Sequence, residues 1–192
     1  MLAMSTTENL SVNKALAGFV KIWQFDPHTG EAVLLVDKNN MILRNGAKLI
    51  AQALGGKPEA KIWGMYIGYN NSPSFTLPDA PIISVDYANP FSSFSAPFGY
   101  LREPLTFSPN YLSSPNYDDN TVLFSTMITT SSSAGGAEFS EDSRIYEVGL
   151  VAAGDMYSAA KDTVFSRTNF NPIQYNSSYN LTITWGVRIL ID

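Results

Sequence analysis

The sequence predicts a mainly β protein, an antiparallel β-sandwich of jelly-roll-like type with one short helix and long loops. Several segments alternate apolar and polar residues with a period of two, which is typical of strands that bury one face. Only one segment has helical periodicity, so the strands do not alternate with helices as they do around a parallel sheet. The hydrophobic content of 45% is enough to fill a core between two sheets.

The 192 residues fit one domain with an arm. Residues 1–16 are polar and patternless, which predicts a flexible N-terminal arm, and residues 17–192 then form a single sandwich domain. Residues 70–118 are rich in Pro, Ser, Asn and aromatic side chains. This stretch is too long for an inert connection and too aromatic for plain disorder. We therefore expect a loop excursion that orders against a neighbour, with short strands at 82–87 and 100–107.

The segment "GFVKIWQFDPHTGEAVLLVD" predicts a β-hairpin. Val20 and Ile22 alternate with more polar or aromatic neighbours, as in a strand with one buried face. Asp26 to Gly30 supply turn chemistry, because Pro fixes φ and Gly accepts a positive φ. The return strand is "EAVLLVD".

The segment "NGAKLIAQALGG" predicts the one helix, of roughly ten residues. Asn45 is the expected N-cap, and Gly55-Gly56 followed by Pro58 should end the helix. Its apolar stripe is expected to comprise Leu49, Ile50, Ala53 and Leu54.

The segment "KIWGMYIGYN" predicts a strand with Trp63, Met65, Ile67 and Tyr69 on one face. Gly64 and Gly68 fall on the other face, where another chain segment is expected to approach closely. Further strands are predicted at "TVLFSTMITT", "RIYEVGLVAA" and "DTVFSRTNFNPIQY".

The segment "SYNLTITWGVRILID" predicts a last strand, whose partner must come from much earlier in the chain or from another chain. The expected buried face comprises Leu181, Ile183, Trp185, Val187, Ile189 and Ile191. In Greek-key sandwiches the last strand often pairs with an early one, and "GFVKIWQF" is the natural candidate. The two chain ends would then lie close together.

The composition restricts the classes of partner. The net charge is −5 and no Lys/Arg stripe appears, which argues against nucleic acid. Charged residues make up only 15%, which suits surfaces that pack against other subunits. There is no cysteine, and neither a signal peptide nor a membrane-spanning segment is predicted, so we expect a protein made in a cytosol that does not act at a membrane.

No constellation of catalytic residues is predicted, and we expect no cofactor and no metal. The single histidine, His28, lies in a predicted turn, which leaves no other position for a Ser-His-Asp triad. Asp118-Asp119 and the cluster of Glu138, Glu141 and Asp142 could hold calcium, but solvated loops are the favoured interpretation because neither has the acid spacing of a calcium loop. A pair of catalytic carboxylates of the glycosidase type is left as an open alternative, although no two carboxylates stand out in the sequence.

The arginines are expected to form structural ion pairs. Arg102 and Glu103 are adjacent in a strand-like segment and should face opposite sides. Arg144, Arg167 and Arg188 fall in or beside the last strands and can pair with acids of this chain, such as Glu147 or Asp192, or of a neighbour.

The aromatic run "YANPFSSFSAPFGY" is interpreted as a subunit-contact loop, because aromatic residues are favoured at interface cores. A carbohydrate platform is the alternative, but the run lacks the cluster of Asp, Asn and Arg that sugar sites use. The predicted interface residues are Phe91, Phe94, Phe98, Tyr100, Tyr111 and Tyr117.

Three segments in order carry a family resemblance: "HTGEAVLLVDKNNMILRNGAKLIAQALGG", "IWGMYIGYNNSP" and "IYEVGLVAAG" with the two strands that follow it. This order resembles small β-sandwich virion proteins of tailed bacteriophages, which occur as capsid decoration or cement proteins and as neck and tail components. The resemblance spans roughly residues 29–192, with the long middle segment uncovered. Each motif alone mostly reflects the residues that any strand, turn or core needs, so the resemblance depends on the order of the three segments.

The resemblance implies a non-enzymatic building block of a virion, assembled in the host cytoplasm. A capsid decoration or cement protein is the leading function; a neck or tail adaptor, a fibre-associated protein and a carbohydrate- or receptor-binding module are the alternatives. The implied partners are the major capsid protein or neck and tail proteins, together with further copies of this chain, with a trimer as one candidate. The expected fold-maintaining residues are Trp63, Glu147, Gly149, Arg167 and Trp185.

Overall fold

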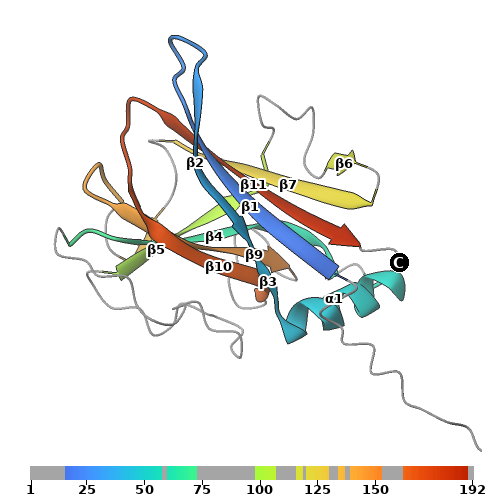
Figure 1. Ribbon diagram of the computed structural model, residues 1–192. Coiled ribbons are helices and arrows are strands. Elements are labelled where there is room, and N and C mark those ends of the chain that lie inside the picture. Colours follow the sequence, from blue (N-terminus) through green and yellow to red (C-terminus); the bar gives the residue numbers. More distant parts are fainter. Residues whose placement is uncertain are drawn as a thin grey trace, which may run out of the picture.

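Two antiparallel sheets pack together in the computed structural model and form a β-sandwich with one short helix (Figure 1). The structure describes residues 16–57, 60–72, 98–106, 116–118, 120–129, 134–136, 139–152 and 162–189. The strand order is β2-β1-β11-β7-β6 in the five-stranded sheet and β3-β10-β9-β4-β5-β8 in the six-stranded sheet. The predicted fold class is confirmed.

The chain crosses between the sheets, so that neither is built from one continuous stretch. The five-stranded sheet comprises β1 Leu16–Phe25, β2 Ala32–Asn39, β6 Asn116–Asp118, β7 Thr121–Ile128 and β11 Asn180–Ile189. The six-stranded sheet comprises β3 Met41–Ile42, β4 Ile62–Asn70, β5 Phe98–Pro104, β8 Ala134–Gly136, β9 Arg144–Ala152 and β10 Thr163–Gln174. Helix α1 spans Arg44–Leu54 and follows β3.

The core lies between the facing surfaces of the two sheets. From the five-stranded sheet it takes Val20, Ile22 and Trp185, which are almost completely buried. From the six-stranded sheet it takes Met65 and Leu150, which are fully buried. Along β11 the predicted face is buried from Leu181 to Val187, as its period of two indicates, whereas Ile189, which was expected on the same buried face, is 53% exposed.

Strand β11 pairs with β1 of the same chain, in an antiparallel ladder that runs from Leu16 opposite Ile189 to Phe25 opposite Asn180. On its other side β11 pairs with β7. The partner predicted for the last strand is therefore confirmed. The Phe19 ring lies over Gly186 on the neighbouring strand. A Cβ atom at position 186 would overlap with this ring, so the close packing of the ring requires glycine there.

Helix α1 begins two residues earlier than predicted, and the predicted cap is wrong. The N-cap residue is Leu43, without a side-chain capping bond, and Asn45 lies in the first turn. The predicted end is confirmed, since Gly55 is the C-cap and Gly56 takes a positive φ of 76°. Leu54 is 86% exposed, so the buried stripe is narrower than expected.

The predicted face of β4 is correct for Met65, Ile67 and Tyr69, which lie in the main core, and wrong for Trp63. An irregularity in the pairing with β9 between Ile62 and Gly64 shifts the alternation. Trp63 consequently packs with Tyr66 in a second cluster on the outer face of the six-stranded sheet. A Cβ atom at Gly64 would overlap with the Glu103 carbonyl oxygen, so the predicted close approach is confirmed there.

The boundaries of the predicted arm and excursion are only partly described. Strand β1 begins at Leu16, the last residue assigned to the arm, and residues 1–15 lie outside the described residues. Within the excursion, β5 corresponds to the strand expected at 100–107, whereas the strand expected at 82–87 lies outside the described residues.

Candidate assembly surface on the β1–β2 hairpin

The β1–β2 hairpin is closed by a turn from Asp26 to Glu31. The Gly30 amide donates to the Asp26 carbonyl oxygen at 2.9 Å, and the Asp26 amide donates to the Glu31 carbonyl oxygen at 2.9 Å. The Asp26 carboxylate accepts from the His28 amide at 2.8 Å and from the Thr29 amide at 3.3 Å. Gly30 takes the positive φ of 77° that the turn requires.

The turn also favours the ionised form of Asp26. The backbone hydrogen bond from His28 lowers the pKa of the Asp26 carboxyl, because it stabilises the ionised form. His28 itself is exposed in the turn, as predicted.

Strand β2 is an edge strand of the five-stranded sheet, since only β1 pairs with it among the described strands. It presents three consecutive aliphatic side chains to solvent: Val33 is 56% exposed, Leu34 39% and Leu35 37%. An exposed edge that is both hydrophobic and eight residues long offers unpaired backbone groups together with apolar side chains. The tip of the hairpin projects beyond the neighbouring end of the sandwich (Figure 1).

A register shift explains why two neighbouring residues, Leu34 and Leu35, are exposed together, while Val33 lies opposite Gln24, nearer the turn. Ile22 lies opposite Val36, but the next residue of β1, Trp23, lies opposite Leu34, so Leu35 is an extra residue in the β2 strand. Such a bulge interrupts the alternation of faces. Only Val36 of β2 contributes to the buried core.

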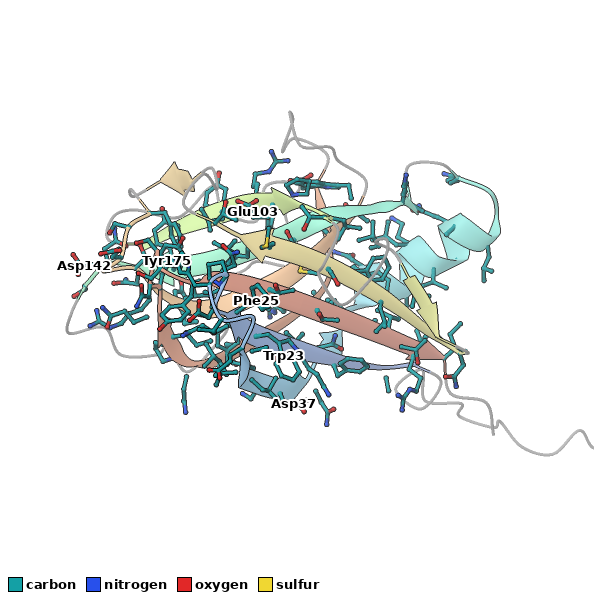
Figure 2. The ribbon with its side chains drawn as sticks, turned by 90° about the horizontal axis from the view of Figure 1, so that it is seen from above. Trp23, Phe25, Asp37, Glu103, Asp142 and Tyr175 are labelled. Carbon is teal, nitrogen blue, oxygen red and sulfur yellow. The ribbon has the colours of Figure 1, made fainter. Side chains whose placement is uncertain are left out.

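Half-buried aromatic side chains continue this surface along the outward face of β1. Phe19, Trp23 and Phe25 alternate with residues that point into the core, and Figure 2 shows Trp23 and Phe25 along this strand. The cross-strand neighbours on β11 are small: Trp23 lies opposite Thr182, which is 4% exposed. We define the β1–β2 surface as Phe19, Trp23, Phe25, Val33, Leu34 and Leu35.

One ion pair lies beside the β1–β2 surface. The Lys21 Nζ atom is 3.6 Å from the Asp37 carboxylate, and both side chains are exposed. The same ammonium lies 5.8 Å from the centre of the Phe19 ring. Lys38, the residue after Asp37, donates to the Asn169 carbonyl oxygen at 2.9 Å and joins this end of β2 to β10.

A second constellation lies on the outer face of the six-stranded sheet, around the fully buried Asp162. Its carboxylate accepts from Trp63 Nε1 at 3.1 Å, from the Tyr66 hydroxyl, and from Arg102 Nε at 3.1 Å and Nη2 at 2.8 Å. The Arg102 guanidinium lies 4.8 Å from the centre of the Trp63 ring. Burial, and then the hydrogen bond to Asp162, raises the pKa of Tyr66. A buried acid with these partners is typical of a structural ion pair, which is costly to break by removing one partner.

Only some of the predicted interface residues can be placed. Phe91, Phe94 and Tyr111 lie outside the described residues. Phe98 and Tyr117 belong to β5 and β6 by their backbones. Tyr100 is half-buried on β5, with its ring 6.0 Å from that of Tyr66, and therefore packs on the second cluster.

The predicted fold-maintaining residues occupy ordered strands. Trp185 and Glu147 are fully buried on β11 and β9. Gly149 lies on β9 between Tyr66 of β4 and Arg167 of β10. Trp63 donates to Asp162, as described above. Their role in maintaining the fold stays a prediction.

The charged residues singled out in the sequence have mostly structural partners. Arg102 bonds to Asp162, while Glu103 lies opposite the core residue Met65, so the two face opposite sides as predicted. Arg144 donates to the Ser72 carbonyl oxygen at 2.9 Å, and Arg188 donates to the Thr121 hydroxyl at 3.2 Å.

Of the acids considered for calcium, Glu141 and Asp142 lie exposed in a turn, and Asp118 belongs to β6. Asp119 and Glu138 are outside the described residues. Across the described part of the chain, no group of three or more His, Cys, Asp or Glu side chains is placed to hold a metal ion.

The exposed edge at β2 was not predicted from the sequence. Its signal is the run Val33-Leu34-Leu35-Val36, which does not alternate and directly follows a turn. Such a run fits a strand that is buried on both faces, and it also fits a strand whose exposed side chains bind another subunit. Only the three-dimensional arrangement distinguishes these two interpretations.

No protein family, curated protein or solved structure matches this chain. No helix among the described residues is long and apolar enough to cross a membrane.

Proposed function

We propose that this chain is a non-enzymatic structural protein of a virion, a capsid decoration or cement protein that stabilises the shell by joining neighbouring subunits through its β1–β2 surface. The observation that carries the proposal is the edge strand β2 with Val33, Leu34 and Leu35 exposed. An edge of this kind binds a neighbour through backbone hydrogen bonds and buries its apolar side chains at the same time.

The expected strength of one such contact is modest. Burying an aliphatic side chain that is about half exposed contributes about 1 kcal/mol, so the three residues together contribute about 3 kcal/mol. This is too little to hold two isolated proteins together against the entropy cost of association. It is sufficient where many copies bind one assembly and each contact adds to the next.

The virion setting is supported by the order of the three segments that resemble small phage virion proteins, and by the low proportion of charged residues, 15%. The partners would be the major capsid protein, or neck and tail proteins in the adaptor variant of the proposal, together with further copies of this chain. A homo-oligomer, with a trimer as one candidate, stays part of the proposal.

The contact is tested by placing a charge on the edge. We expect Leu34→Lys to leave the fold intact and to abolish self-association or binding to particles, because a lysine on an edge strand opposes further pairing. The matched control is Leu54→Lys, since Leu54 is an equally large side chain, 86% exposed, on α1. Light scattering gives the mass, and sedimentation with particles gives binding. Equal behaviour of both variants would remove the β2 edge from the proposal.

The virion location is tested separately. Phage particles are purified from cultures that produce this chain, and an antibody against it is applied to the intact particles and examined by electron microscopy. We expect labelling over the shell. Labelling at the neck or tail would select the adaptor variant, and purified particles that lack the chain would refute the virion proposal.

A carbohydrate- or receptor-binding module is the second candidate, because a polar cavity of about 420 Å³ lies at one end of the sandwich. It is lined by Gln24, Glu141, Gln174, Tyr175 and Asn176. Amides, a carboxylate and a tyrosine are groups that can bind sugar hydroxyls. A glycan array would support this candidate if one glycan class bound and Gln174→Ala removed binding. An array on which no glycan bound would exclude this candidate and leave assembly as the proposed function.

A further inference from the structure

A second cavity, of about 380 Å³, lies between helix α1 and one end of the sandwich. The helix supplies Leu49, Ile50 and Ala53, and the sheets supply residues that include Phe165 and Val187. Figure 1 shows the helix beside the ends of β1 and β11 at this end of the sandwich. All lining residues are apolar except Lys61.

The first turn of α1 is held against the six-stranded sheet beside this cavity. At its start α1 lies against β10: the Leu43 amide donates to the Phe165 carbonyl oxygen at 3.1 Å. A Cβ atom at Gly46 would overlap with the same oxygen, so the first turn approaches the sheet as closely as backbones can. The later turns carry Leu49, Ile50 and Ala53 along the cavity: Leu49 is buried in the main core, Ile50 packs against that core, and Ala53 is exposed.

The size and lining indicate the class of ligand. A cavity of about 150 Å³ lined by Leu, Ile and Phe takes up benzene, and ligand pockets commonly begin at about 300 Å³. A cavity of 380 Å³ therefore has room for a flexible aliphatic chain. Lys61 is exposed and forms no ion pair with any described residue, so its ammonium is available to a negatively charged head group.

We propose that this cavity binds the aliphatic chain of a fatty-acid-like amphiphile, with the carboxylate at Lys61. The apolar lining accepts the chain, and the single cation favours an anionic head group over a neutral or cationic one. The site lies apart from the β1–β2 surface, and the inference does not depend on the proposed function.

The first test is calorimetric titration of the full chain with sodium decanoate below its micelle concentration. We expect saturable binding with one site per chain, weaker binding of octanoate by about tenfold because two methylenes fewer are buried, and weaker binding of decanol. Absence of saturable decanoate binding would overturn the proposal. Equal affinity for octanoate and decanoate would also overturn it, because the chain would then lie outside the cavity.

Two pairs of variants locate the site. Ala53→Phe fills the cavity and should reduce decanoate affinity at least tenfold, whereas Ala51→Phe places the same side chain at an exposed position of the same helix that does not line the cavity. Lys61→Glu should weaken decanoate binding several-fold and leave decanol binding unchanged, whereas Lys57→Glu changes a nearby exposed lysine outside the lining and should do neither. Ala53 and Lys61 are exposed, so these variants should fold.

The variants also distinguish other occupants. If Ala53→Phe converts a dimer into a monomer in light scattering while decanoate does not bind, the cavity holds a second copy of the chain and the proposal is wrong. If Ala51→Phe and Ala53→Phe weaken decanoate binding equally, the ligand binds the helix surface instead of the cavity, which also overturns it.

Discussion

The buried ion pair of Arg102 and Asp162 should be among the most sensitive points of the fold. Removing the carboxylate by Asp162→Ala leaves the Arg102 guanidinium, whose side chain is 16% exposed, without its counter-ion. It also removes the acceptor of the Trp63 and Tyr66 hydrogen bonds. Breaking a buried pair by removing one partner costs about 3–5 kcal/mol, because an uncompensated charge stays in the interior.

A loss of this size is a large part of the stability of an ordinary domain, which is about 5–15 kcal/mol. For a chain of this length it corresponds to a fall in melting temperature of about 10 °C. The same protein offers a contrasting pair: Lys21 and Asp37 are 3.6 Å apart, with side chains 39% and 54% exposed. Solvent screens such a pair, so Lys21→Ala should cost less than about 1 kcal/mol.

The assay is equilibrium unfolding in urea, followed by tryptophan fluorescence. Tyr66→Phe is included as a milder change that removes one hydrogen bond to the carboxylate and should cost about 1.5–3 kcal/mol. This variant still reports on the network if Asp162→Ala does not fold. A loss below about 1 kcal/mol for Asp162→Ala, or equal losses for Asp162→Ala and Lys21→Ala, would refute the view that the buried pair locks the outer face of the six-stranded sheet.

Further predictions concern packing, the hairpin turn and the arm. Gly64→Ala should destabilise the protein by about 1–3 kcal/mol in the same urea assay, because its Cβ atom meets the Glu103 carbonyl oxygen; an unchanged midpoint would contradict this. The carboxyl of Asp26, titrated by NMR, should have a pKa below 3.8, and its stabilising contribution to the turn should be present above this pH and disappear as the pH falls through the lowered pKa. A normal pKa would exclude the His28 hydrogen bond in solution. Deletion of residues 1–15 should leave the number of chains per oligomer, measured by light scattering, unchanged if the β1–β2 surface drives self-association, and a smaller number would assign that role to the arm.

Much of the fold follows from local sequence signals. The alternation along β1 and β11 identifies the faces that carry Ile22 and Trp185 into the core, and the long-range pairing of these strands follows from the need of a late strand for an early partner. Asp26 and Gly30 identify the turn, since each has a conformational reason to be there.

Other features depend on three-dimensional context that sequence patterns do not contain. The shift near Ile62 places Trp63 on the opposite face from the one its period predicts, and nothing in the local residues marks a bulge. Asp162 accepts hydrogen bonds from residues that are far away in the sequence, so no local pattern predicts its part in this buried network. The exposure of Leu34 depends on the order of strands in the sheet, which makes β2 an edge.

The position of β11 has a consequence for the timing of folding. It lies between β1 and β7, so the two halves of the five-stranded sheet have no direct pairing until β11 joins them. β11 is synthesised after every other described strand. The β1–β2 hairpin therefore lacks its β11 partner, and the inner edge of β1 stays unpaired, until synthesis is nearly over. A nascent chain therefore exposes both edges of this hairpin, and we expect rapid completion of synthesis or chaperone protection to decide how much of the protein reaches its folded state.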